Sequence, residues 1–334
     1  MNKKVASIGV VIIVLLVEAG SYVWMKKSTA PKVYHVGILS GIEIFSSITD
    51  GFKQKMAQLG YVEGKNIVYD VQNLNPDSDA YRTAIQKFIA DKDDLIVTFP
   101  TEPSVEAKTL TQGTGIPVLF AMAAIEDIDL VDSVTKPGSD LTGARYPSPE
   151  LAVQRFDLLL EMMPKLKNLW LIYDSTYPAT KSAIAALRPV AAAAGVNLVE
   201  DHVLTVADIQ AALAKRGAQS SLGVDAILIM PETLVQSPDG WPLVAKFAAD
   251  HQLPIAGSAS FEADSGAVFS YIPDNVVTGE LIAPMADKIF KGIPAGTIPV
   301  ATPESYLRIN YTLAQKLGLT LSADILARAN EIIH

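Results

Sequence analysis

Short apolar runs alternate with longer amphipathic stretches along most of the chain. The first run covers residues 33–39. In the stretch that follows it, Phe52, Met56 and Leu59 recur at helical spacing. An apolar run followed by an amphipathic helix is typical of a β–α unit, so its repetition predicts parallel sheets.

The runs fall into two series that repeat the same order of strand and helix. The predicted strands are residues 33–39, 67–71, 95–99 and 116–120 in the first series and 169–173, 196–200, 226–230 and 254–257 in the second. Residues 94–102 also parallel residues 225–233, because an acid and a proline stand at the same separation in both. Duplication of a β–α lobe explains this likeness, although any two short buried strands resemble each other.

Segments rich in proline and glycine separate the two series. One lies at residues 136–149, and two further crossovers are predicted near residues 263–266 and 294–303. We therefore predict an α/β protein with two Rossmann-like parallel-sheet lobes joined by a three-segment hinge. The predicted lobe 1 is residues 31–145 plus 266–296, and the predicted lobe 2 is residues 146–265 plus 297–334.

Residues 1–30 have the pattern of an export signal or a membrane anchor. Asn2-Lys3-Lys4 precedes an apolar run over residues 5–17, and small residues follow it. Cleavage after Ala19 is one alternative. The other is a retained anchor extending to Met25, which is about long enough to span a bilayer although Glu18 lies within it. Both alternatives predict that the rest of the chain lies outside the cytoplasm, in the periplasm or on the outer face of the membrane.

Composition narrows the functional classes. The 334 residues include no Cys, so the sequence predicts no disulfide, no metal–thiolate site and no lipid-modified N-terminal Cys. The formal net charge of −9 argues against a nucleic-acid partner. The four His have no metal-ligand spacing, and no nucleophile elbow, phosphate loop or dinucleotide fingerprint is present. We therefore expect no metal, no cofactor and no catalysis.

Five segments, in order and at similar spacing, resemble a known family. They are VGIL at residues 36–39, LGYVEGKNIVYDVQN at 59–73, ADKDDLIV at 90–97, LVDSVTKPGSDLTG at 130–143 and LGLTLSADILARA at 317–329. Over about residues 33–330 the chain resembles the ABC-transporter substrate-binding proteins, which include tryptophan-binding lipoproteins of Gram-positive bacteria and have a type I periplasmic-binding fold.

The resemblance implies a monomeric, extracytoplasmic solute-binding subunit of an ABC importer. Such a protein captures a small molecule, here an amino-acid-like one with aromatic amino acids among the candidates, between its lobes. The hinge then closes, and the closed form docks on a membrane permease. A membrane-anchored ligand-sensing module of the same fold is the alternative function. A repressor of this fold would instead begin with a helix-turn-helix.

Two departures from the family pattern limit what the resemblance implies. The Gram-positive members carry a lipidated Cys, which this chain lacks. Family members also commonly have an Asp shortly after the strand predicted at residues 254–257, where this chain reads Ser258-Ala259-Ser260. If that acid holds a ligand ammonium, tryptophan is only one candidate among several.

The loops that follow the carboxyl ends of parallel strands are expected to line the ligand crevice. Ser46, Ser47, Thr101 and Ser104 fall at helix starts, where free N–H groups attract anions, although plain N-capping is the alternative role. The candidate partners of a ligand ammonium are Glu43, Glu102, Glu232 and Asp274. The resemblance favours Asp274, with Glu43 second.

Aromatic side chains in these loops are candidates for stacking on a planar ligand. They are Phe45, Tyr173 and Tyr177, and Tyr173 is equally well interpreted as a core residue. The other predicted contacts are Met122, Ala123, Thr233, Ser258, Ser260 and Asn275.

Overall fold

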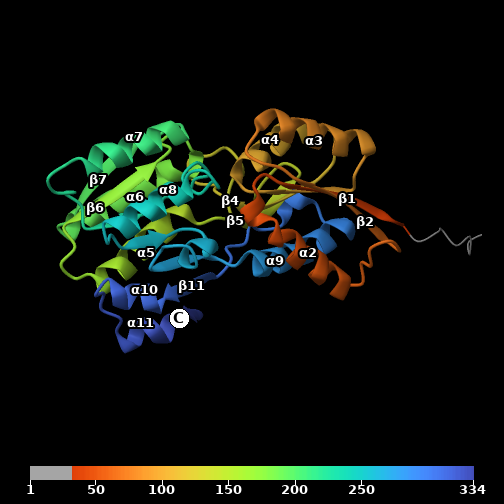
Figure 1. Cartoon of the computed structure of the whole chain (residues 1–334). Coiled ribbons are helices and arrows are strands. Elements are labelled where there is room, and N and C mark those ends of the chain that lie inside the picture. The colour runs from red at the N-terminus through yellow and green to blue at the C-terminus, as the bar shows by residue number, and fades with distance from the viewer. Residues whose placement is uncertain (1–31) are drawn as a thin grey trace, which may run out of the picture.

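The computed structural model describes residues 32–334, which form two lobes side by side (Figure 1). The predicted signal or anchor at residues 1–30 lies outside the described residues. Within residues 32–334, no helix combines the length and the apolar character needed to cross a membrane.

Lobe 1 is built on a five-stranded sheet in the order β2-β1-β3-β4-β5, and all its strand pairs are parallel. The strands are β1 (Tyr34–Ser40), β2 (Ile67–Asn73), β3 (Leu95–Phe99), β4 (Val118–Ala123) and β5 (Leu141–Arg145). The helices are α2 (Ser47–Gln58), α3 (Ser78–Asp91), α4 (Thr101–Thr111) and α9 (Asn275–Phe290), with short η1 (Glu43–Phe45) and η3 (Ala295–Thr297). Helices α2 and α9 cover one face of the sheet, and α3 and α4 cover the other.

The helix pair α2 and α9 is packed backbone to backbone. A Cβ added at Gly279 of α9 would lie 2.1 Å from the carbonyl oxygen of Ile48, and one at Gly51 of α2 would lie 1.9 Å from that of Val276. Only glycine permits this approach. The pair therefore joins an early and a late segment of the chain into one layer.

Lobe 2 is built on a seven-stranded sheet in the order β12-β11-β10-β9-β8-β6-β7. The strands are β6 (Asn168–Tyr173), β7 (Asn197–His202), β8 (Ala226–Leu228), β9 (Ile255–Gly257), β10 (Phe269–Pro273), β11 (Ser305–Asn310) and β12 (Glu331–Ile333). All pairs are parallel except β10 with β11. The helices are α5 (Ser148–Met162), α6 (Pro178–Ala193), α7 (Val206–Gly217), α8 (Trp241–Asp250), α10 (Tyr311–Lys316) and α11 (Ala323–Arg328), with short η2 (Ser260–Ala263). Helices α5 and α6 pack on one face, and α7 and α8 on the other.

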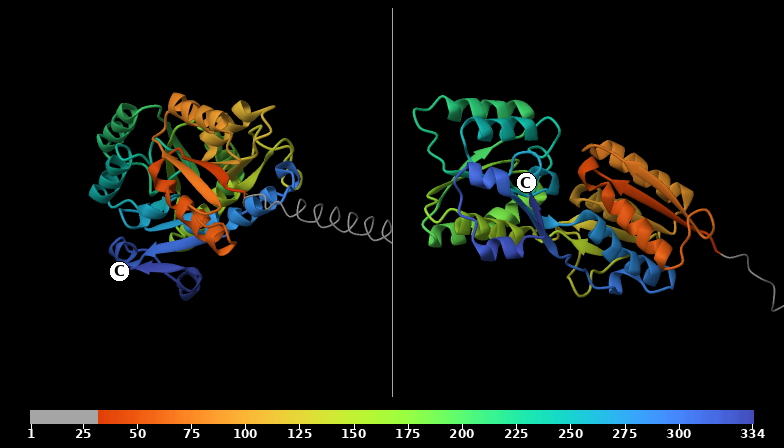
Figure 2. Two further views of the ribbon diagram at one scale, coloured as in Figure 1. Left: turned by 90° about the vertical axis from the view of Figure 1, so that its right-hand side faces the viewer. Right: turned by 60° about the horizontal axis from the view of Figure 1, so that its bottom comes forward.

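The chain crosses between the lobes three times, and all three segments run between them in Figure 2. The first crossing is at residues 146–147, the second follows Pro273, and the third precedes Ser305. At the first crossing Arg145 pairs with Glu126 of lobe 1 and Glu150 of lobe 2. The Nε atom of Arg145 also donates to Thr302 Oγ1 of the third crossing at 2.9 Å. Arg145 thereby links both lobes and two of the three crossings.

The predicted fold class is confirmed, and seven of the eight predicted strands differ from the observed ones at one or both ends. The lobe boundaries at residues 266 and 297 differ from the structure. Strand β10 pairs with β9 and β11, so the chain stays in lobe 2 up to Pro273. Residues 298–301 stay in lobe 1, because Ala301 bridges Ala144 of β5 and the Ile298 carbonyl accepts from Thr142. The prediction of a wholly parallel sheet in lobe 2 was also wrong at one pair, because β10 and β11 are antiparallel.

Candidate ligand-binding site

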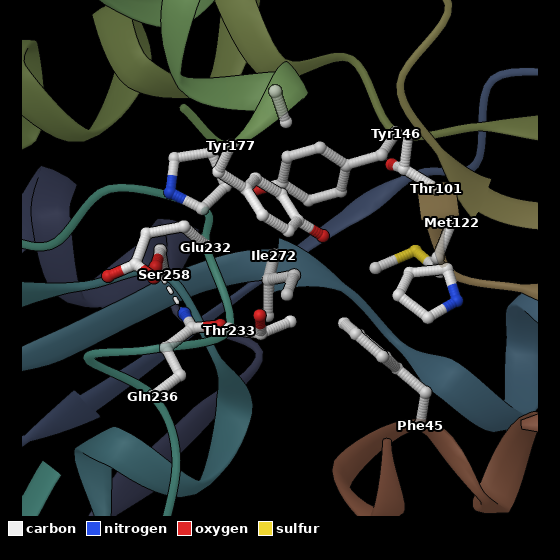
Figure 3. A pocket seen from close by; sticks show the side chains of 13 residues that line it. Phe45, Thr101, Met122, Tyr146, Tyr177, Glu232, Thr233, Gln236, Ser258 and Ile272 are labelled. Carbon is white, nitrogen blue, oxygen red and sulfur yellow. Dashed lines mark hydrogen bonds between the residues drawn. The ribbon is translucent and has the colours of Figure 1, made fainter. Parts of the chain in front are cut away.

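A pocket lies between the lobes, at the carboxyl ends of the parallel strands (Figure 3). It is lined by Phe45, Pro100, Thr101, Met122, Tyr146, Tyr177, Ala179, Pro231, Glu232, Thr233, Gln236, Ser258 and Ile272. The free space among these side chains is about 20 Å³. That is room for about one water molecule. The lobes are thus closely apposed around it.

Lobe 1 supplies mainly apolar and hydroxyl side chains to the pocket. Phe45 comes from η1, and Thr101 begins α4, where its hydroxyl accepts from the Ala124 N–H at 3.0 Å. Met122 has a φ of +50° at the point where β4 shifts register against β5. Such left-handed backbone is unfavourable for a non-glycine residue and is often found at binding sites. The irregularity in β4 sets the direction in which Met122 projects.

Lobe 2 supplies most of the polar side chains. Glu232, Thr233 and Gln236 come from the loop after β8, and Ser258 directly follows β9. Glu232 is 2% exposed and accepts from the N–H groups of Leu234 at 2.5 Å and Val235 at 2.9 Å. Burial raises the pKa of Glu232 to about 7, although those two N–H groups act in the opposite direction. The pocket therefore contains a nearly inaccessible carboxylate.

One hydrogen bond joins the lobes beside the pocket. Tyr177, at the start of α6, donates from its hydroxyl to Glu102 Oε2 of α4 at 2.9 Å. Burial raises the pKa of the Glu102 carboxyl, and burial together with Glu102 raises that of the Tyr177 hydroxyl. Tyr177 also packs against Ala124 of lobe 1. Tyr177 and Glu102 thus form a polar contact that exists only when the lobes are together.

Positive side chains do not balance these acids at the pocket surface. Among residues 32–334, no Lys, Arg or His lines the pocket. Arg155 does not line the pocket but is 1% exposed and donates to the hydroxyl of the lining residue Tyr146 at 2.6 Å and to the Tyr271 carbonyl at 2.9 Å. In the same part of the chain, no three His, Asp or Glu side chains gather as a metal site would require. The described lining of the pocket thus contains an acidic and three aromatic side chains and no basic one.

Comparison with known proteins agrees with this geometry. A family model described as ABC transporter substrate binding protein matches residues 36–333. The chain belongs to this family. Its members are substrate-binding proteins rather than enzymes, which confirms the expectation that the chain is not a catalyst.

Individual relatives of this substrate-binding protein extend the comparison. A tyrosine-binding protein of Clostridioides difficile (strain R20291) is 27% identical over 304 residues, which cover 90% of this chain and 85% of that protein. An ABC domain in complex with L-Trp from Streptococcus pneumonia has a TM-score of 0.79 at 22% identity, with 90% of this chain and all of that chain covered. The ligand-free, open structure of a substrate-binding protein with adhesive properties from Clostridium difficile has a TM-score of 0.70 at 24% identity, with 90% and 99% covered.

The structure places seven of the predicted contact residues in the wall of the substrate-binding protein's pocket. They are Phe45, Thr101, Met122, Tyr177, Glu232, Thr233 and Ser258. Glu102 does not line the pocket, but it accepts a hydrogen bond from Tyr177, which does. The other predicted residues of lobe 1 lie behind or beside it. Ser104 is fully buried and donates to the Pro100 carbonyl at 2.5 Å, and Ala123 is fully buried. Glu43 lies in η1, Ser46 precedes α2 and Ser47 is its first residue.

The remaining four predicted residues also lie outside the pocket. Asp274, the favoured ammonium partner, instead caps α9 by accepting from the Val277 N–H at 2.9 Å. Asn275 donates to the Ile44 carbonyl at 2.7 Å. Ser260 borders a separate groove with Asp274. Tyr173 donates to Glu200 at 2.5 Å and its ring packs on His202, so it serves the β6–β7 edge of lobe 2.

Tyr146 and Gln236 were not predicted at all, and Pro100, Ala179, Pro231 and Ile272 were not predicted as individual contacts. Tyr146 lies in the first crossing, which was interpreted as a hinge rather than as pocket wall. Gln236 lies three residues beyond Thr233, the last residue after β8 that was predicted as a contact. The rule that loops after parallel strands line the crevice identifies the right loops. It does not say which residues of each loop reach the pocket.

Proposed function

We propose that this substrate-binding protein is the extracytoplasmic subunit of an ABC importer that captures an aromatic amino acid between its lobes. The observation that carries the proposal is the composition of the pocket. Its lining combines the carboxylate of Glu232 with the aromatic rings of Phe45, Tyr146 and Tyr177, and it has no basic side chain among the described residues. Glu102 does not line the pocket but accepts the hydrogen bond from Tyr177.

The acids match the amino group of such a ligand. A buried carboxylate is costly unless a cation or hydrogen-bond donors compensate it, and an ammonium supplies both. Glu232 has N–H partners on both oxygens but no neutralising cation in the pocket wall. An ammonium beside Glu232 would keep the carboxylate ionised despite its raised pKa.

The other ligand groups have matching surfaces. Helices α4 and α6 begin at the pocket with Thr101 and Pro178. Their positive N-terminal ends favour a ligand carboxylate. Aromatic rings on both lobes favour a flat side chain, which aromatic faces attract beyond simple area burial. The names of the relatives that bind tyrosine and L-Trp support the same ligand class.

The size of the pocket supports capture by hinge motion. A space of about 20 Å³ does not admit an amino acid while the lobes stay in this arrangement. The three crossings would allow the lobes to separate, and the Tyr177–Glu102 hydrogen bond and the ion pairs of Arg145 are among the contacts that would change. Ligand binding would then shift the population between open and closed forms. The closed monomer would dock on the permease.

A thermal-stability screen tests the ligand class. The purified chain would be heated with each amino acid, with purines and with small carboxylates. A ligand that binds only the folded state raises the midpoint by mass action. We expect the largest increase with tyrosine or tryptophan. If no amino acid at millimolar concentration shifts the midpoint, the amino-acid assignment is wrong.

A transport assay tests the importer function. The gene would be deleted in its host, and uptake of labelled tyrosine and tryptophan would be followed with and without the restored gene. Loss and recovery of uptake support the importer. Ligand binding in vitro without any effect on uptake would favour the sensing module instead.

A further inference from the structure

A buried hydrogen-bond network links two lining residues of the pocket in lobe 2 to a carboxylate farther inside the lobe. It consists of Gln236, Ser258 and Glu262, which are 6%, 1% and 0% exposed. Gln236 Nε2 donates to Ser258 Oγ at 2.6 Å and to Glu262 Oε1 at 3.3 Å. Glu262 Oε2 accepts from the N–H groups of Ser258 at 2.5 Å and Ala259 at 2.9 Å. The carboxylate of Glu262 in η2 therefore holds together the loop after β8, the residues after β9 and η2 itself.

The backbone is adapted to admit this carboxylate. A Cβ at Gly257 would lie 2.7 Å from Glu262 Oε2, so a larger residue at the end of β9 would displace it. Glu262 belongs to η2, only two residues beyond the segment that lacks the acid common in the family. This chain thus has a carboxylate near that position, but one that faces the protein rather than the ligand.

The charge of Glu262 fixes the orientation of the Gln236 side chain. An ionised carboxylate only accepts hydrogen bonds, so the amide nitrogen of Gln236 must face it. The amide oxygen then points the other way, and Gln236 lines the pocket. Figure 3 shows the nitrogen turned toward Ser258 and the oxygen on the opposite side. Among residues 32–334, no donor is bonded to this oxygen.

Gln236 and Glu232 lie on the same loop after β8, and both line the corner of the pocket that this loop forms. We propose that Gln236 accepts a hydrogen bond from the ligand's amino group and that Glu262 positions it to do so. An ammonium has three donors and no acceptor, so it matches a corner made of acceptors. Gln236 is then a specificity-determining contact and Glu262 a positioning residue. The inference rests on the proposed amino-acid function.

The substitution Glu262→Gln gives this inference a specific consequence. Its side-chain oxygen can keep the bond to Ser258 N–H, but its NH₂ group would replace the Oε1 that faces Gln236. Two amide nitrogens cannot bond each other, so Gln236 would turn its oxygen inward and its NH₂ group to the pocket. The corner would then repel an ammonium, while a ligand that lacks an amino group would lose nothing there.

The test is calorimetric titration of the full chain with two probes, L-tyrosine and desaminotyrosine. Desaminotyrosine keeps the ring and the carboxylate but has no amino group. Burial raises the pKa of Glu262 to about 7, against the opposing effects of the Ala259 and Ser258 N–H groups and of Arg155. We therefore choose about pH 8, where the carboxyl is mostly ionised. Glu200→Gln, a carboxylate of lobe 2 at the β6–β7 edge, is the matched control.

We expect Glu262→Gln to weaken tyrosine binding by about tenfold or more and to leave desaminotyrosine binding within about twofold. Gln236→Met, which removes the acceptor at similar size, should weaken tyrosine binding by a similar factor. The double variant should be no weaker than either single one, because both changes remove the same contact. Glu200→Gln should bind both probes as the wild type does.

Two results would overturn the inference. Equal weakening of both probes by Glu262→Gln would show that Glu262 only supports the fold, and additive effects of Glu262→Gln and Gln236→Met would show that they act separately. If the wild type binds no amino acid at all, the proposed function fails and this inference fails with it. If the wild type binds tyrosine but the variants do not discriminate between the probes, only this inference fails.

Discussion

The two lobes contribute differently to the same pocket. Lobe 1 presents Phe45, Thr101 and Met122, while lobe 2 presents Glu232, Gln236 and the hydroxyl of Ser258. The lobes also differ in construction. In lobe 1 the helices α2 and α9 are in close backbone contact, whereas lobe 2 buries the carboxylates of Glu232 and Glu262 in the segments that follow β8 and β9. We propose a division of labour, in which lobe 2 recognises the amino group of the ligand and Phe45 of lobe 1 packs on its side chain.

The largest expected effect concerns the construction of lobe 1. Gly279→Ala places a methyl group 2.1 Å from the Ile48 carbonyl oxygen, so α2 and α9 must move apart. We expect a loss of about 4 kcal/mol in the free energy of unfolding, measured by urea denaturation. Gly217→Ala, in helix α7 of lobe 2, is the control, because its new methyl group meets side-chain atoms and no backbone, namely the Phe247 ring at 3.3 Å and His251 Nε2 at 3.7 Å. If Gly217→Ala lowers the free energy of unfolding as much as Gly279→Ala does, the close contact between α2 and α9 does not explain the loss.

The buried acid of lobe 2 predicts a pH dependence of stability. Glu262 has a pKa of about 7 in the folded protein and an ordinary value of 4.5. Between these values the folded state binds a proton that the unfolded state has lost, so stability falls as pH rises. The contribution is about 3 kcal/mol, most of it lost between about pH 5 and pH 7.

Thermal midpoints of the wild type and Glu262→Gln, followed over this pH range, measure that contribution. Glu232, with a pKa also of about 7, acts in the same direction and remains in both proteins. The wild type should therefore lose stability more steeply with rising pH than Glu262→Gln does. Parallel curves would contradict the assignment of this proton to Glu262.

The third effect concerns ligand recognition. Glu232→Gln removes the charge that we place beside the ligand ammonium while keeping the size of the side chain. We expect an affinity for tyrosine or tryptophan about 100-fold lower, measured by calorimetric titration. Phe45→Leu, on the lobe 1 side, should cost only about tenfold because it removes contact area and no charge. If Phe45→Leu has the larger effect, the division of labour is reversed.

The smallest effect concerns the contact between the lobes. Tyr177→Phe removes the hydroxyl that donates to Glu102 and keeps the ring in the pocket. Since this bond forms only when the lobes are together, the closed form should lose about 1 kcal/mol relative to the open form. Small-angle scattering of the ligand-free variant should show a larger radius of gyration than that of the wild type. An unchanged radius would show that this contact does not influence closure.

Much of the architecture follows from local patterns. Fully buried runs such as Leu95–Phe99 are apolar except for Thr98 and are followed by a proline, so their position is predictable. Strand β10 was harder to assign to a lobe, because its sequence specifies a strand but not its neighbours. Its pairing with β9 and β11 depends on long-range contacts that a local pattern does not contain.

The candidate site was predictable to the level of loops. Glu232, Thr233 and Ser258 follow strands at the sheet edge where parallel strands end, which a sequence pattern reveals. Asp274 follows a strand as well, but its carboxylate satisfies the N–H of Val277 and not a ligand. Whether an acid caps a helix or faces a cleft depends on backbone direction after the strand. Glu262 also follows a strand, and η2 directs its carboxylate into the protein, where a local sequence pattern would not reveal its hydrogen-bond partners.

A crystal structure of the full chain with the amino acid that stabilises it most tests the account most directly. We predict that the ligand lies between the lobes, with its amino group within hydrogen-bond distance of Glu232 and Gln236 and its side chain beside Phe45 and Tyr177. A ligand bound in the groove at Ser260 and Asp274, or one whose carboxylate faces Glu232, would contradict it.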